Sequence, residues 1–195
     1  MNRVAIVVEG PSDLVFWKRV FYNYFHADQF VFDVRSLNGA TNLIREAPTL
    51  TDIFRSAKYH AVIFMLDADK AECAQQVLDL FDNAFKNQLL SEPRESRFAH
   101  VCIAFREVES WILADECCMR ELVFPNYQFG GDQDRIAGKA KLLRLCKDHG
   151  CAFTGMEDRE FAKQAAEFFS PAEARLRSPS FDHSWTRVCQ CLSLT

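Results

Sequence analysis

The stretch AVIFMLDAD at residues 61–69 places six consecutive apolar residues directly before Asp67, Ala68 and Asp69. An apolar run of this length indicates a strand that is buried on both faces, which is typical of a parallel sheet. Residues two apart in an extended chain point the same way, so the carboxylates of Asp67 and Asp69 can face one point. The sequence therefore predicts a buried strand whose carboxyl end presents a pair of acids.

Further apolar runs, with helical patterns between them, flank this strand along the chain. Their alternation predicts an α/β fold, Rossmann-like, with a mostly parallel sheet flanked by helices. Pro48 is expected to interrupt one helix, because proline disfavours helical geometry in the residue before it. We expect strands at 4–8, 30–34, 61–66 and 98–105, and helices at about 12–25, 41–57, 71–85 and 107–115.

The pattern changes after residue 115. Residues 1–115 are expected to form the α/β core, and residues 116–195 a C-terminal helical extension that packs on the core. Within the extension we expect helices near 138–149, 157–168 and 184–192, with Ser178-Pro179-Ser180-Phe181 as a loop or helix cap.

Composition excludes several classes of protein. The net charge of −4 argues against a constitutively basic nucleic-acid binder. No run approaches the roughly 18 apolar residues of a membrane span, and the strand-like start of the chain leaves no room for a secretory signal. We therefore expect a cytoplasmic protein with no membrane partner. The eight cysteines include no C-x-x-C pair and are expected to be reduced and mostly buried rather than zinc ligands.

Acidic residues follow three of the expected strands. Glu9 follows the first, Asp67 and Asp69 the third, and Glu107 and Glu109 the fourth. The carboxyl ends of parallel strands meet at one edge of a sheet, so all five side chains are expected at that edge. Paired carboxylates repel unless a cation or a proton relieves them, and hard oxygen ligands favour Mg²⁺ or Mn²⁺. The alternative for Asp69 is a helix N-cap.

The segments around the other acids also allow two interpretations. Glu9 is followed by Gly10 and Pro11, and it is a candidate metal ligand or proton carrier, or else an acid favoured at a helix start. Glu107 and Glu109 are candidates for a second metal site, or first-turn acids with a structural role. Arg106 is a candidate for binding a phosphate oxygen or for pairing with these acids.

Basic residues cluster in the extension. Lys141, Arg144 and Lys147 are three apart and form a stripe on one expected helix, with Arg135 and Lys139 before it. The stripe is either a solvated face or a surface that contacts a phosphate backbone. Lys70, beside the aspartate pair, is expected to be solvated.

These residues resemble the TOPRIM superfamily, which topoisomerases, bacterial-type primases, recombination proteins and the overcoming-lysogenization-defect nucleases share. The superfamily pattern is a strand ending in Glu-Gly and a later strand ending in Asp-x-Asp, matched here by Glu9-Gly10 and Asp67-Ala68-Asp69. The resemblance implies that Glu9, Asp67 and Asp69 support Mg²⁺-dependent making or breaking of phosphodiester bonds. Ala71 stands where topoisomerase-type members often carry a third acid.

The chain is also similar to a family of short bacterial TOPRIM-like proteins of unknown function. The similarity lies in Arg106-Glu107-Val108-Glu109-Ser110-Trp111, continuing to Asp115, and in the later Ser178–Phe181 segment. Some relatives of this type are found with ATPase partners in phage-defence systems, so the resemblance allows an ATPase partner here. A homodimer is also left open.

Three functional hypotheses follow. The first is a metal-dependent nuclease, with DNA favoured over RNA, in which Glu9, Asp67, Asp69, Arg106 and Glu107 act at the phosphodiester. The second is a non-catalytic TOPRIM-like subunit that regulates or assembles a multi-protein system. The third, a receiver-like phosphorylation switch, is disfavoured because that fold places its acid pair after the first strand.

Overall fold

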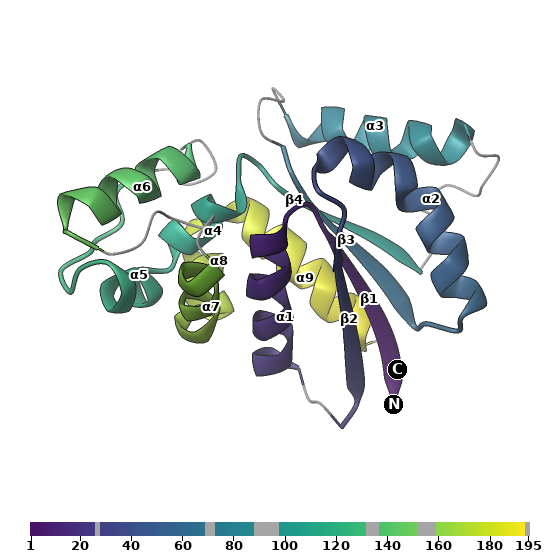
Figure 1. Cartoon of the computed structure of the whole chain (residues 1–195), viewed down its shortest axis with the longest axis horizontal. Helices are drawn as coiled ribbons and strands as arrows, with labels where there is room; N and C mark the ends of the chain where they lie inside the picture. Colours follow the sequence, from purple (N-terminus) through teal and green to yellow (C-terminus); the bar gives the residue numbers. More distant parts are fainter. Residues whose placement is uncertain (26–27, 69–72, 88–97, 132–136, 152–158, 194–195) are drawn as a thin grey trace.

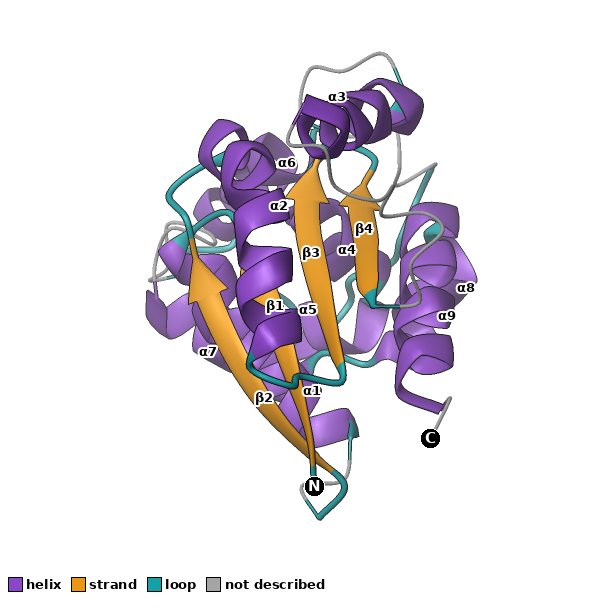
Figure 2. Ribbon diagram, turned by 90° about the vertical axis from the view of Figure 1, so that its right-hand side faces the viewer, coloured by secondary structure: helices purple, strands orange, loops and turns teal. Residues whose placement is uncertain are grey.

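A computed structural model describes residues 1–25, 28–68, 73–87, 98–131, 137–151 and 159–193. Within these residues four strands form one sheet in the order β2-β1-β3-β4. Every neighbouring pair is parallel, and Figure 2 shows the arrowheads pointing the same way. The predicted parallel α/β sheet is therefore confirmed. The strands are β1 (Asn2–Val8), β2 (Phe30–Ser36), β3 (Ala61–Asp67) and β4 (Ala99–Ala104).

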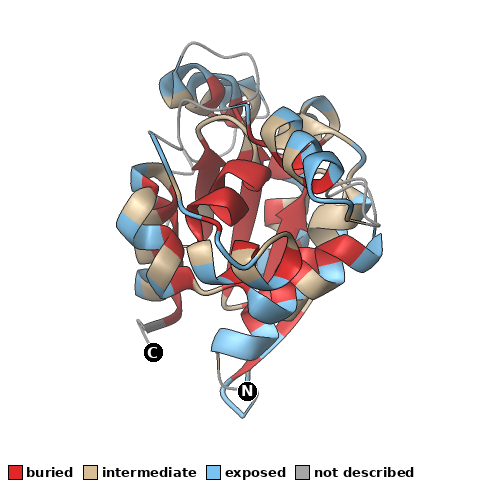
Figure 3. Ribbon diagram, turned by 90° about the vertical axis from the view of Figure 1, so that its left-hand side faces the viewer, coloured by how far each residue is buried: buried red, intermediate tan, exposed pale blue. Residues whose placement is uncertain are grey.

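Helices cover both faces of the sheet. The helices α2 (Ala40–Ser56) and α3 (Ala74–Asn87) lie on one face, and α1 (Pro11–Tyr24) and α9 (Pro179–Ser193) on the other (Figure 1). Alternate side chains of β1 divide between these layers, since Ala5 and Val7 join one apolar cluster and Val4, Ile6 and Val8 the other. As a result, β1, β3 and β4 are mostly buried, as the red ribbons of Figure 3 show, whereas β2 at the edge of the sheet is partly exposed.

The remaining helices gather beyond α1 at one end of the molecule (Figure 1). They are α4 (Val108–Ala114), α5 (Glu116–Leu122), α6 (Gly138–Asp148), α7 (Arg159–Phe168) and α8 (Pro171–Arg177).

Among the described residues, no helix is both long and apolar enough to cross a bilayer.

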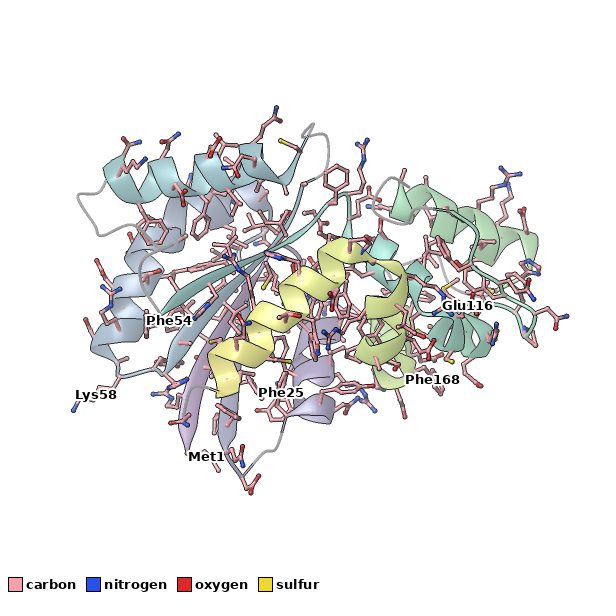
Figure 4. All side chains as sticks on the ribbon, turned by 180° about the vertical axis from the view of Figure 1, so that it is seen from behind. Met1, Phe25, Phe54, Lys58, Glu116 and Phe168 are labelled. Atoms are coloured by element: carbon pink, nitrogen blue, oxygen red, sulfur yellow. The ribbon has the colours of Figure 1, made fainter. Side chains whose placement is uncertain are left out.

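One apolar core spans the expected boundary at residue 115. Trp17, Trp111 and Phe161 belong to the same buried cluster, and α7 lies against α1. Figure 4 shows α9 crossing the face of the sheet from behind. The division into a core and an extension stays a prediction, and residues of both parts contribute to one buried apolar cluster.

The expected interruption at Pro48 is wrong. The helix α2 runs unbroken through this residue, with Pro48 inside it. Ala47, Pro48 and Thr51 are all buried, and the Thr51 hydroxyl donates to the Ala47 carbonyl oxygen at 2.8 Å. Burial of one continuous face holds the helix together across the backbone bond that proline cannot make.

Two short helices, α5 and α8, were not predicted, although each begins with a recognisable cap. The Asp115 carboxylate accepts the Cys118 N–H at 3.0 Å at the start of α5. The Ser170 hydroxyl accepts the Glu173 N–H at 3.4 Å at the start of α8, where Pro171 occupies the first helical position. Both helices have only seven residues, so cap chemistry rather than apolar periodicity was the available signal.

Asp115 joins the two short helices. Its side chain is fully buried, and it accepts backbone N–H groups from both Cys118 and Ser170. Burial raises the pKa of this carboxyl, while the two backbone donors oppose the rise. One buried carboxylate thus fixes α5 relative to the start of α8.

We expect Asp115→Ala to lower the free energy of unfolding by about 2 kcal/mol, because it removes a helix cap and leaves the Ser170 N–H without its acceptor. Urea denaturation followed by circular dichroism measures the change. Asp52→Ala, which removes a half-exposed ion pair with Arg55, is the control and should change stability by less than about 0.5 kcal/mol. Equal effects of the two substitutions would contradict the assignment.

Candidate functional site

Glu9 and Asp67 meet at the carboxyl ends of two neighbouring strands. Glu9 directly follows β1, and Asp67 is the last residue of β3. The two strands pair in parallel, with Val7 opposite Phe64. The Glu9 Oε1 atom accepts the Asp67 backbone N–H at 2.8 Å, so the structure brings these two predicted residues into direct contact.

Asp67 also reaches the next strand connection. Its Oδ1 atom accepts the Val108 N–H at 3.1 Å, at the first residue of α4. On the backbone, Asp67 lies opposite Ala104 of β4, and Ala68 N–H donates to the Ala104 carbonyl oxygen at 2.8 Å. The strand ends carrying three of the sequence motifs therefore converge on Asp67.

A small cavity of about 10 Å³ lies beneath these two carboxylates, with room for about one water molecule. Its lining includes Trp17 and Trp111, whose rings meet edge to face with centroids 5.8 Å apart. Glu9 and Asp67 thus border a cavity that apolar side chains partly line, and both carboxylates keep partial access to solvent. The lining residues are Val8, Glu9, Asp13, Trp17, Met65, Leu66, Asp67, Val108 and Trp111.

Asp13 is a site residue that the sequence analysis missed. Its Oδ2 atom accepts the Gly10 N–H at 2.9 Å, so it holds the turn that follows Glu9. Burial raises the pKa of this carboxyl. This helix was expected to begin at about residue 12, but α1 begins at Pro11 and Gly10 is its N-cap. An acid three residues after the cap was the signal in the sequence.

Glu107 holds the start of α6. Its Oε2 atom accepts the Lys139 N–H at 2.7 Å, in the first turn of that helix. One carboxylate oxygen of Glu107, a predicted metal ligand, therefore stabilises the start of α6. Arg106 lies half-buried in the segment between β4 and α4. The predicted roles of Glu107 and Arg106 in chemistry stay predictions.

Glu109 lies in the first turn of α4 with only 6% of its surface exposed. Burial raises the pKa of its carboxyl to about 7, and the negative charges of Glu107 and Asp13 add to the rise. The positive charge of Lys139 acts in the opposite direction. Three acids and one lysine from α1, α4 and α6 therefore influence one another electrostatically beside the cavity.

The carboxylate oxygens of Glu9 and Asp67 are the donors that Mg²⁺ and Mn²⁺ prefer, and both side chains are half-exposed at the sheet edge. Among the residues that the structure describes, no three acids, histidines or cysteines are grouped as a metal site. Asp69, the third predicted ligand, and Lys70 lie outside the described residues. The donor chemistry fits a divalent cation, and the ligand set stays a prediction.

Trp111 links two motifs that are distant in the sequence. Its Nε1–H donates to the Ser180 hydroxyl oxygen at 2.8 Å, and its ring meets that of Phe181 with centroids 5.1 Å apart. The Ser178 hydroxyl accepts the Phe181 N–H at 3.2 Å, so Ser178 caps α9, and the helix begins at Pro179 rather than near residue 184 as expected. The Ser178–Phe181 segment thus supports one wall of the cavity.

Comparison with solved structures places this architecture in the TOPRIM-like α/β class. The fold is similar to the C-terminal region of the Burkholderia pseudomallei OLD protein, with 13% identity and a TM-score of 0.55 over 99% of this chain and 100% of that chain. It is also similar to the C-terminal region of the Xanthomonas campestris pv. campestris OLD protein, with 15% identity and a TM-score of 0.51 over 97% and 95%.

Residues 8–188 match the family described as domain of unknown function DUF4276, and the chain belongs to that family. No functionally curated protein matches the chain. The two OLD structures are only 13% and 15% identical to this chain, so they show its fold and not its activity.

We expect the stability of the metal-free protein to fall as pH rises from about 4.5 to about 7, relative to Glu109→Gln. The raised pKa means that folding favours the neutral carboxyl, so stability is fully present below the unfolded pKa of 4.5 and is lost as pH rises through about 7. The loss should approach ~3 kcal/mol. Urea denaturation in chelator at several pH values measures it, and a difference between the two proteins that is independent of pH would contradict it.

Proposed function

We propose that the chain is a divalent-metal-dependent nuclease that cleaves phosphodiester bonds at the edge of the sheet where β1, β3 and β4 end. The contact between the Glu9 carboxylate and the Asp67 backbone carries this proposal. It brings together acids from two motifs that are 58 residues apart in the chain. A parallel sheet binds its ligands at this edge.

Glu9, Asp67 and Asp69 would hold Mg²⁺ or Mn²⁺, and Glu107 and Glu109 are candidates for a second site. A bound divalent cation would activate water and stabilise negative charge at phosphorus. Asp13 lies within the same cavity and adds a carboxylate to the set.

The chain's own groups would orient the substrate and move protons. In the alternative to metal binding, with the cation held by the aspartates, Glu9 would carry a proton at the attacking or leaving oxygen, and its orientation is fixed because Oε1 accepts the Asp67 N–H. Arg106 would neutralise a phosphate oxygen. Lys139 contributes positive charge close to Asp13 and Glu109.

The TOPRIM-like fold supports nucleic acid as the substrate, with DNA favoured over RNA. The similar solved structures are C-terminal regions of longer OLD proteins. A net charge of −4 gives this chain little general attraction for a polyanion. An ATPase partner, in a phage-defence or DNA-processing system, would supply part of the DNA affinity.

A second candidate is a regulatory or assembly subunit. Glu9 and Asp67 each accept a backbone N–H, from Asp67 and Val108 respectively. These bonds order the strand ends without any chemistry, so the acids have a purely structural use as well.

Cleavage assays separate the two candidates. We expect the full chain to cleave plasmid, single-stranded DNA or RNA in Mg²⁺ or Mn²⁺, and to lose activity in chelator because an acidic site repels the substrate. Asp67→Ala and Glu9→Ala should each reduce the rate by at least ~100-fold. Gel electrophoresis of labelled substrates measures the rates.

Asp79→Asn is the matched control, because it removes an exposed carboxylate on α3 outside the site and should leave the rate unchanged. Circular dichroism verifies that each variant is folded. Folded wild-type protein that cleaves none of the substrates would favour the regulatory candidate. Activity that survives both alanine substitutions would contradict the nuclease site.

A further inference from the structure

The helix α6 has one anchored face and one basic face. Leu142 and Cys146 are buried, whereas Arg144 and Lys147 are exposed and Lys141 is half-buried. The basic residues are three apart, so they share a side of the helix that spans about 9 Å from Lys141 to Lys147.

The start of α6 is docked in a fixed position on α4. A Cβ atom on Gly138 would lie 2.4 Å from the Ser110 backbone nitrogen and 2.8 Å from the Glu109 carbonyl carbon, so only glycine permits this approach. The neighbouring Lys139 N–H donates to the Glu107 carboxylate at 2.7 Å. Both contacts join α6 to the segment that carries the candidate site residues.

The basic face begins at the site and leads away from it. Gly138 packs against Glu109 and Ser110, and the Lys139 N–H donates to Glu107, which places the first turn of α6 next to the segment that carries the acids. The 11-residue helix then extends for about 16 Å. A polyanion whose scissile bond lies at Glu9 and Asp67 would therefore meet positive charge along α6.

The basic side chains remain available to a ligand. Arg144 pairs with Asp148 at 3.5 Å, but both side chains are highly exposed, at 83% and 55%, and a solvated pair of this kind exchanges partners at little cost. Lys141 lies over the Phe129 ring, with its Nζ atom 5.6 Å from the ring centre, and this cation–π contact helps to position the ammonium group.

We propose that the outer face of α6, formed by Lys141, Arg144 and Lys147, binds the phosphate backbone of a nucleic acid and guides it into the acidic site. This inference rests on the proposed nuclease function and names the surface that would bind the substrate of that nuclease. Contacts of this type are sequence-independent, so the surface fixes position and register rather than base identity.

The test is binding of labelled duplex DNA, single-stranded DNA and RNA to the full chain, in Ca²⁺, by fluorescence anisotropy at several salt concentrations. Lys141→Gln/Arg144→Gln/Lys147→Gln should weaken binding of the preferred nucleic acid by about tenfold or more. For duplex DNA it should reduce the slope of log K against log salt by about 3, because each lost phosphate contact removes about 0.9.

The chain offers a closely matched control in Arg45→Gln/Arg55→Gln/Lys58→Gln. Arg45 has an ion pair with Glu46, and Arg55 lies over the Phe98 ring. The control therefore removes three positive charges, ion pairing and a cation–π contact of the same kinds as the α6 variant removes. Lys58 lies at the end of the molecule away from α6 (Figure 4). The control should bind like the wild type.

Three results would overturn the proposal. They are wild-type affinity in the α6 variant, equal weakening in the control, and absence of binding by the wild type to all three nucleic acids. The assays distinguish loss of cleavage from loss of binding, because Asp67→Ala should abolish cleavage but leave binding through α6 intact. A failed nuclease assay with intact, α6-dependent binding would therefore reject the activity and retain the surface.

Discussion

The arrangement of the site depends on one hydrogen bond between the ends of two buried parallel strands. The Glu9 carboxylate accepts the backbone N–H of Asp67, and the Asp67 carboxylate in turn accepts the N–H that begins α4. Strand pairing fixes the distance between these residues, because β1 and β3 are buried in the apolar core and cannot shift in register without exposing it. The acids are held in place before any ligand binds.

Aromatic packing supports that arrangement from below. Trp17 of α1 meets Trp111 of α4, and Trp111 meets Phe181 at the start of α9. These contacts join three segments that are far apart in the sequence into one aromatic cluster, and Trp17 and Trp111 of this cluster line the cavity beside the carboxylates. They also connect two short sequence motifs, the one that contains Trp111 and the one that contains Ser180, because the Trp111 indole N–H donates to the Ser180 hydroxyl oxygen.

Much of this fold was predictable because β1 and β3 contain long apolar runs and because parallel strands place their carboxyl ends together. That rule predicts that Glu9 and Asp67 lie at the same edge of the sheet, whereas their direct hydrogen bond also requires β1 and β3 to be neighbours. Other features depend on tertiary contacts that have no local signature. Pro48 stays helical because its face is buried, and Glu107 caps α6 because Gly138 lets that helix approach. Asp13 and the caps of α5 and α8 did have local signals, which apolar periodicity does not detect.

The most direct test of the metal site is an anomalous difference map from crystals of the full chain grown or soaked in Mn²⁺. We expect a peak about 2.0–2.2 Å from carboxylate oxygens of both Glu9 and Asp67. Such a peak would place the cation where the two strands end. Ordered Glu9 and Asp67 side chains with no manganese between them, at saturating Mn²⁺, would contradict a metal site at this edge of the sheet.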